Sequence, residues 1–318
     1  MNARDVLELR QRVRRSLREV FDGLGFLEVD TPVLATEVLP EAHIDPVPVS
    51  VDGGPRATHY LQASPELLMK RLLAAGSGPI WQFARSFRAG EVGRQHDIEF
   101  VLLEWYAPGA TLDDTAALLE RLCGATLGTA GLERATCSDA FLAHAGVDPL
   151  GAPLAALESA AARAGVAIPE SVAALPEAQR WDRAFESLLA EVVQPRLGHG
   201  RPTMLEAWPA SQAAFARLDS TRPGVARRFE LFAAGVELAN GWEEETDGAA
   251  LAARIDAANR ARVMDGRAPL PVPARLVAAH GPTMPTGVGA ALGFERLAML
   301  AAGADSIDAV RCFTSRTA

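Results

Sequence analysis

FARSFRAGEVGRQHDIEFVLLEWY, residues 83–106, is the stretch that decides the fold of this chain. Two runs of aromatic, aliphatic and β-branched residues flank a polar loop, and this pattern predicts a β-hairpin. The loop holds Arg88, Glu91 and His96, so cationic and hydrogen-bonding groups gather at the open end of the hairpin. Arg88 offers the planar fork that suits a pair of phosphate oxygens. The segment therefore predicts a site for an anionic ligand, with a charged surface hairpin as the alternative.

The second strand of this hairpin carries two polar groups on one side. Side chains alternate across a strand, so Phe100, Leu102, Glu104 and Tyr106 are expected on the same face. A carboxylate and a phenol are thereby expected beside whatever the loop binds.

The rest of the chain predicts an α+β fold with a mainly antiparallel sheet flanked by helices. Apolar residues recur at three- and four-residue steps from Val6 to Leu24, which predicts a helix that ends at Gly23 or Gly25. Loops between neighbouring strand-like runs are too short for helical crossovers, which favours antiparallel pairing. Besides the hairpin, the strand-like runs are residues 26–29, 60–62, 204–208 and 229–240.

Residues 111–200 differ in composition from the rest. They are rich in Ala, Leu, Glu and Arg with little β-branching, which predicts several helices inserted into the order of the strands. The expected organisation is a single domain over residues 1–318 that carries this helical insertion.

Composition and charge limit the classes of function. The chain is 49% hydrophobic and 22% charged, which is typical of a globular protein. Its formal net charge of -9 argues against a wide nucleic-acid footprint. Cys123, Cys137 and Cys312 lack the spacing of a disulfide framework or zinc site, and no apolar run is long enough to cross a bilayer. We therefore expect a cytoplasmic protein.

A second polar constellation lies in FELFAAGVELANGWEEETD, residues 229–247. If Ala234 and Gly235 form a two-residue turn, Glu230 and Glu237 become diagonal neighbours on one face of a hairpin. Two carboxylates at that separation repel unless a cation lies between them, which favours a magnesium ion on ATP phosphates. In the alternative, both carboxylates merely face water.

A third constellation is GVGAALGFERLAML, residues 287–300. Its glycines allow close backbone approach before a helix that is expected to start near Glu295, with Arg296 in the first turn. No GxxxxGK[ST] pattern occurs, which excludes a phosphate-binding P-loop. Arg88 and Arg296 would stabilise the negative charge of a triphosphate when a carboxylate attacks its α-phosphorus and pyrophosphate leaves.

In order along the chain, these segments resemble the signature motifs of class II aminoacyl-tRNA synthetases. GFLEVDTPVL (25–34) resembles motif 1, residues 83–106 resemble motif 2 and residues 287–300 resemble motif 3. The closest subgroup is that of the lysyl-tRNA synthetases, on ASPELLMKRLL (63–73) and ELANGW (237–242). No anticodon-binding domain is expected, so the architecture is similar to stand-alone members that ligate (R)-β-lysine to a lysine of translation elongation factor P.

The resemblance implies a role for each of several residues. The substrate amino acid would be bound by Ser64, Pro65, Glu66, Tyr106, Asn240 and Glu244. ATP would be bound by Arg88, Glu91, His96, Asp97, Glu237, Leu238, Gly293 and Arg296, with Arg88 and Arg296 as the catalytic residues. Magnesium would be held by Glu230 and Glu237. Asp97 stands where the subgroup has an amide, and Ala291 stands where the synthetases tend to have glycine, which is consistent with a β-amino acid.

The resemblance also implies an activity. ATP and Mg²⁺ would serve to activate (R)-β-lysine or lysine as an adenylate, and the aminoacyl group would pass to a lysine of elongation factor P. Motif 1 implies a homodimer. Two alternatives remain: a truncated synthetase-like ligase for another amino acid or a tRNA acceptor, and a non-catalytic amino-acid-binding regulator.

Overall fold

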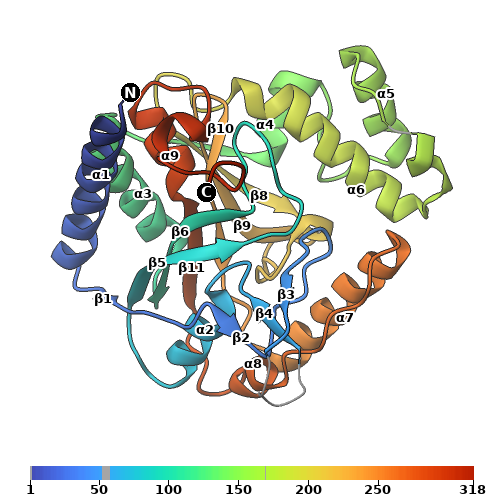
Figure 1. Cartoon of the computed structure of the whole chain (residues 1–318). Coiled ribbons are helices and arrows are strands. Elements are labelled where there is room, and N and C mark those ends of the chain that lie inside the picture. The colour runs from blue at the N-terminus through green and yellow to red at the C-terminus, as the bar shows by residue number, and fades with distance from the viewer. Residues whose placement is uncertain (1, 52–57, 169) are drawn as a thin grey trace. The chain divides into compact units, whose positions relative to one another are not determined.

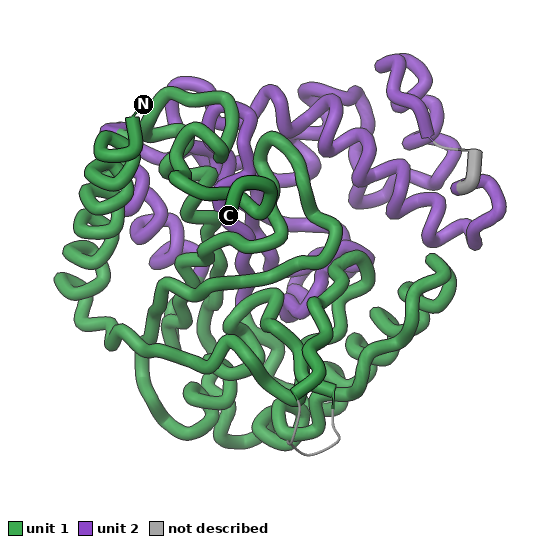
Figure 2. The backbone as a smooth tube through the Cα atoms, viewed as in Figure 1, with its two compact units in different colours: residues 1–111, 125–127, 244–318 green, residues 112–124, 128–243 purple. Residues whose placement is uncertain are grey.

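The computed structural model describes residues 2–51, 58–168 and 170–318, which form two compact units (Figure 2). The first unit comprises residues 1–111, 125–127 and 244–318, and the second comprises residues 112–124 and 128–243. Within the described ranges, no helix is both long and apolar enough to cross a membrane.

The first unit is built on four strands in the order β1-β5-β6-β11. β5 (Ile80–Phe87) and β6 (Glu99–Pro108) are antiparallel, which confirms the predicted hairpin. β11 (Gly287–Gly293) pairs antiparallel with β6, and β1 (Leu27–Glu28) pairs parallel with β5. A smaller antiparallel sheet contains β2 (Leu34–Ala35), β4 (His59–Leu61) and β3 (Val47–Val49).

Helices cover both faces of the β5–β6 hairpin. The helices of this unit are α1 (Ala3–Gly23), α2 (Glu66–Ala74), α7 (Gly248–Met264), α8 (Ala274–Ala279) and α9 (Phe294–Ala301), and Figure 1 labels them. On one face Phe21 of α1 stacks on Trp81 of β5, with ring centroids 4.9 Å apart. On the other face Met69 of α2 packs in a buried cluster with Ile80 and Tyr106. α1 ends at Gly23, as its apolar pattern predicted.

The second unit contains four strands in the order β10-β9-β8-β7. They are β7 (Glu133–Thr136), β8 (Thr203–Pro209), β9 (Val225–Ala233) and β10 (Val236–Glu243). Ala233 pairs with Val236, so the predicted turn at Ala234 and Gly235 is confirmed. A bulge between Glu237 and Ala239 shifts the register beyond it. β7, which the composition did not predict, pairs parallel with β8.

Helices make up much of residues 111–200, as the composition predicted. They are α3 (Leu112–Leu127), α4 (Cys137–Ala145), α5 (Leu154–Ala164) and α6 (Glu177–Leu188). Their core is aromatic: the ring of Phe185 stacks on that of Phe141 at 4.7 Å and meets the ring of Trp208 edge-on at 5.9 Å. The apolar spacing of these helices is therefore explained by packing within the second unit.

Candidate functional site

A buried ion-pair cluster lies where α2 meets the inner face of β6 in the first unit. Glu66 and Lys70 are four residues apart on α2, and the Lys70 Nζ atom is 2.7 Å from the Glu66 carboxylate. The same Nζ atom is 2.7 Å from the Glu244 carboxylate. The side chains of Lys70, Glu66 and Glu244 are 2%, 9% and 3% exposed. Lys70 was not predicted as a site residue, although it is the only lysine in the chain.

The strand β6 adds two polar groups to this cluster. The Tyr106 hydroxyl donates a hydrogen bond of 2.8 Å to Oε1 of Glu104, and both side chains are buried. They lie on one face of the strand, as the alternation of β6 predicted. Oε2 of Glu104 is buried and has no hydrogen-bond partner among the described residues. We call Glu66, Lys70, Glu104, Tyr106 and Glu244 the Lys70 cluster.

A glycine on the neighbouring strand makes room for the cluster. Gly289 of β11 lies directly opposite Tyr106 of β6, and Ala291 lies opposite Glu104. A Cβ atom built on Gly289 would overlap both the Tyr106 ring and the Glu244 carboxylate. The predicted need for close backbone approach in this glycine-rich segment is therefore explained at Gly289 by the phenol and the carboxylate.

Electrostatics differ among the members of the Lys70 cluster. Burial by itself lowers the pKa of Lys70, but the charges of Glu244 and Glu66 outweigh it and raise that pKa above its ordinary value. Burial, together with the charge of Glu66, raises the pKa of Glu104 well above its ordinary value. Burial and the charge of Glu104 also raise the pKa of Tyr106. Lys70 is therefore charged at neutral pH, and its surroundings oppose ionisation of Glu104.

Ser64 and Pro65 position the start of α2. Pro65 is the N-cap residue, and the backbone N–H of Glu66 donates to the Ser64 hydroxyl at 3.4 Å. This turn places Glu66 in the first turn of the helix, from which its side chain reaches Lys70. Of the predicted substrate residues in the first unit, the structure thus brings together Ser64, Pro65 and Glu66, and joins Glu66 to Glu244 through Lys70.

Arg88 comes directly after β5, and its guanidinium lies over the ring of Phe100 in β6. Its guanidinium carbon is 5.0 Å from the centroid of the Phe100 ring, and its Nη1 atom is 3.8 Å from the Glu91 carboxylate. The Nε atom of Arg88 is buried without a hydrogen-bond partner among the described residues. This arginine therefore retains a buried donor that an anionic ligand could satisfy.

His96 and Arg296 meet at the other end of the polar loop. A Gly93–His96 bridge closes the loop, and Nη2 of Arg296 lies 2.7 Å from Nε2 of His96. The Nε atom of Arg296 donates to the carbonyl of Gln95 at 3.4 Å. Gly293 is the N-cap of α9, so Arg296 lies in the first turn, as predicted. The loop of motif 2 and the helix of motif 3 are thus joined through these two side chains.

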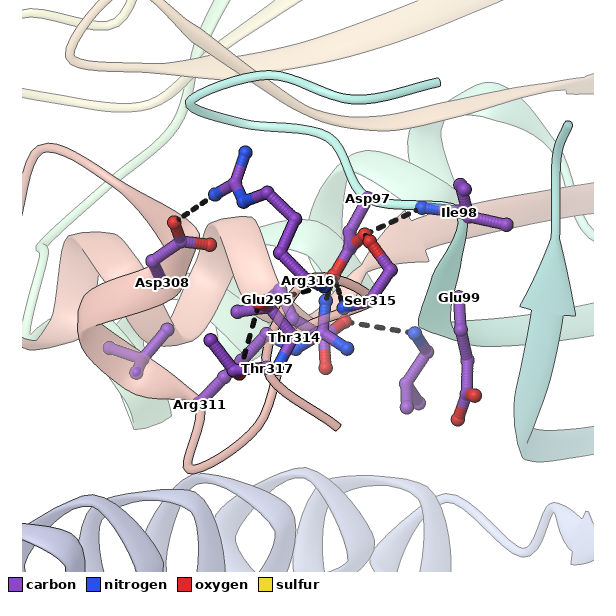
Figure 3. A network of polar contacts seen from close by, with 12 residues as sticks. Asp97, Ile98, Glu99, Glu295, Asp308, Arg311, Thr314, Ser315, Arg316 and Thr317 are labelled. Atoms are coloured by element: carbon purple, nitrogen blue, oxygen red, sulfur yellow. Dashed lines mark hydrogen bonds and ion pairs between the residues drawn. The ribbon is translucent and has the colours of Figure 1, made fainter. Parts of the chain in front are cut away.

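Asp97 has a different environment from that expected beside a nucleotide. Its buried carboxylate is 2.6 Å from the Arg311 guanidinium and accepts hydrogen bonds from the backbone and hydroxyl of Ser315, and Figure 3 shows this network. Burial raises the pKa of Asp97, but the bonds from Ser315 and Ile98 and the charge of Arg311 outweigh burial and lower it. The carboxylate that replaces the expected amide therefore holds the C-terminal residues, and its contact with ATP stays a prediction.

The remaining predicted residues belong to the second unit. Glu230 is paired with the Arg228 guanidinium at 2.5 Å, and the same arginine donates to Oδ1 of Asn240 at 3.2 Å. Glu237 lies opposite Phe232 of β9 in the hairpin, and the Leu238 side chain is buried. In the part of the chain that the structure describes, no group of three or more His, Cys, Asp or Glu forms a metal site. The roles assigned to Glu230, Glu237, Leu238 and Asn240 therefore stay predictions.

Comparisons with known proteins point to one family. The model of a family described as tRNA synthetases class II (D, K and N) matches residues 1–317. Curated relatives named elongation factor P–(R)-β-lysine ligase are similar to this chain, and three of them illustrate the match. The protein of Enterobacter sp. (strain 638) is 37% identical over 308 residues, 96% of this chain and 93% of the relative.

The two other relatives give the same picture. The Yersinia enterocolitica protein is 38% identical over 310 residues, with the same shares of both chains, and the Sodalis glossinidius protein is 39% identical over 303 residues, 93% of this chain and 91% of the relative. The α+β fold, the three motifs and these matches agree. The chain belongs to the class II tRNA synthetase family of the D, K and N group.

Proposed function

We propose that this chain is an ATP-dependent ligase that activates (R)-β-lysine or lysine and transfers it to a lysine of translation elongation factor P. The observation that carries the proposal is the match to relatives of that name, at 37–39% identity over more than nine tenths of this chain. A second line of support is chemical. The Lys70 cluster contains more carboxylates than cations, which suits a substrate with two ammonium groups.

In the binding step, we assign the substrate ammonium groups to Glu66, Glu104, Tyr106 and Glu244. The carboxylates and the phenol oxygen accept hydrogen bonds from the ammonium groups, and burial strengthens each of these interactions. A cation that binds beside Glu104 would offset the cost of its buried charge and favour its ionised form. Asn240, in the second unit, stays the predicted partner of the remaining polar groups of the amino acid.

In the activation step, the substrate carboxylate oxygen attacks the α-phosphorus of ATP. The bond from that phosphorus to the bridging oxygen of pyrophosphate breaks, and an aminoacyl-adenylate forms. Arg88 and Arg296 hold the phosphate oxygens and stabilise the charge that develops there. Glu91, His96, Asp97, Leu238 and Gly293 are the further residues that we assign to ATP.

Magnesium has a reasonable donor set in this chain. Mg²⁺ is usually bound by one or two carboxylates together with substrate phosphates, and Glu230 and Glu237 provide two carboxylates on the β9–β10 hairpin. When bound, the ion would neutralise phosphate charge. Glu230 also pairs with Arg228 through one carboxylate oxygen, so the guanidinium and the ion would share this carboxylate.

In the transfer step, a neutral ε-amine of the acceptor attacks the carbonyl carbon of the adenylate. The bond from that carbon to the phosphate oxygen breaks, AMP leaves, and the amine nitrogen loses a proton to solvent as the amide forms. The chain needs no nucleophile of its own, because both attacking groups belong to substrates. We also propose a cytoplasmic location, where the chain would meet a translation elongation factor. We further propose that the chain forms a homodimer.

The experiment is a mass measurement on the acceptor. Purified elongation factor P from the same organism is incubated with the chain, ATP, Mg²⁺ and either (R)-β-lysine or L-lysine, and its intact mass is recorded. A gain of one lysyl group, lost when ATP is omitted, supports the proposal. Lysylation of tRNA in place of the protein in a parallel reaction would favour the synthetase-like alternative, and no modification of either would reject both.

A further inference from the structure

Lys70 is an unusual residue for this chain and for its location. The chain contains 31 lysine and arginine residues, and Lys70 is the only lysine among them. It is also one of the largest fully buried side chains of the described protein. An arginine carries a wide planar fork, whereas an ammonium is compact and can lie between two carboxylates. The position therefore requires an ammonium where the rest of the chain uses guanidinium groups.

The geometry around Lys70 brings two like charges close together. An oxygen of Glu66 and an oxygen of Glu244 each lie 2.7 Å from the same Nζ atom, so the two oxygens are no farther apart than twice that distance. Two buried carboxylates at this separation repel strongly, and the ammonium between them removes the repulsion. Lys70 thus holds the two carboxylates side by side.

The other charged groups near the cluster do not change this count. Arg254 of α7 is 3.2 Å from the Glu245 carboxylate, so these two residues together add no net charge, although Arg254 also interacts electrostatically with Glu244. His280 of α8 is buried; burial, together with the charge of Lys70, lowers its pKa, and it is neutral at pH 7. The cluster itself holds three carboxyl groups, from Glu66, Glu104 and Glu244, against one ammonium.

We propose that Lys70 is a specificity-determining residue, because its ammonium offsets one of three buried carboxylates and so leaves the cluster matched to a ligand with two ammonium groups. A ligand with one ammonium leaves one of the three carboxyl groups without a cationic partner. A ligand with two ammonium groups also supplies a partner for Glu104, whose Oε2 is buried without a hydrogen-bond partner among the described residues. The inference rests on the proposed function and adds the residue that sets the charge of the substrate.

The test compares the diamine preference of four proteins. Preference is the ratio of kcat/KM for L-lysine to kcat/KM for L-norleucine in ATP–pyrophosphate exchange, since norleucine lacks only the second ammonium. Glu104→Gln removes one negative charge from the cluster. The preference for lysine over norleucine should therefore fall at least about tenfold. Lys70→Met combined with Glu104→Gln restores the original net charge and frees carboxylate oxygens of Glu66 and Glu244 for the ligand.

The double variant should therefore regain most of the wild-type preference, which a merely structural role of Lys70 would not produce. A matched control combines Arg262→Met with Glu104→Gln, which removes a buried cation that is paired with Asp45 outside the cluster and should give no recovery. A double variant as poor as or poorer than Glu104→Gln, or equal recovery in the control, overturns the inference. In every variant, a KM for ATP close to that of the wild type shows that the protein is folded.

Other outcomes are also decisive. If the double variant does not fold, the single Glu104→Gln decides: a preference unchanged from wild type overturns the inference, and a loss of at least about tenfold upholds the charge match. Failure of the proposed function looks different, because the wild-type chain would then show no preference for L-lysine or (R)-β-lysine over norleucine.

Discussion

Gly289→Ala tests the packing of the Lys70 cluster without touching any charge. The new Cβ would overlap the Tyr106 ring and the Glu244 carboxylate, which are both held by buried partners. Overpacking of this kind costs about 1–3 kcal/mol, and for a chain of this size about 1 kcal/mol lowers Tm by roughly 2 °C. We therefore expect Tm to fall by about 2–6 °C.

The effect on activity should be specific to the amino acid. Displacement of the phenol and of one carboxylate should raise KM for lysine by about tenfold or more in pyrophosphate exchange, whereas KM for ATP should change by less than about twofold. Gly23→Ala is the matched control, because a Cβ there meets nothing within 4 Å at the end of α1. A normal KM for lysine in Gly289→Ala, or an equal change in the control, would refute the assignment of this cluster to the substrate.

Three further predictions concern other parts of the chain. Arg296→Ala should reduce exchange by at least about 100-fold, because it removes a phosphate-binding cation, while a nearly normal rate would contradict that role. Asp97→Ala should leave the partly buried Arg311 without this ion-pair partner and lower stability by about 3 kcal/mol, measured by urea unfolding. Finally, incubation with ATP and lysine alone should leave the side chains unmodified in a peptide map, because Lys70 is buried and protonated; lysylation at Lys70 would contradict this.

The contacts of Asp97 with Arg311 and Ser315 also predict a dependence of stability on pH. The pKa of Asp97 is lowered in the folded chain, so its carboxylate contributes stability that is fully present above the unfolded value of about 3.9. That contribution is lost as pH falls through the lower folded value. The difference in unfolding free energy between the wild type and Asp97→Asn should therefore shrink from pH 6 towards pH 3. A constant difference would contradict the contribution of the ionised Asp97 carboxylate to stability.

Local patterns were enough to predict the hairpin of β5 and β6. Alternation placed Glu104 and Tyr106 on one face, and the turn at Ala234 followed from two residues between strand-like runs. Such features depend on neighbours in sequence, so the sequence alone predicts them. The wider fold class followed from the order of three motifs, whose family the comparisons support.

Long-range pairing was harder to predict. Glu66 and Lys70 have the spacing of an ordinary exposed helix pair, and nothing local indicates that Glu244 would join them. Asp97 looked like a changed nucleotide contact, because its partners Arg311 and Ser315 lie far along the chain and outside every motif. In both cases the missing information was which distant charge lies beside a buried carboxylate.

The most direct test of the whole account is ATP–pyrophosphate exchange by the wild-type chain with three amino acids compared side by side. Exchange with (R)-β-lysine or L-lysine that exceeds exchange with L-norleucine by at least about 100-fold is the predicted result, since norleucine lacks the second ammonium and leaves a buried carboxyl group without its partner. Equal exchange with norleucine, or none with any diamino acid, would contradict a site built around Lys70 to match two ammonium groups.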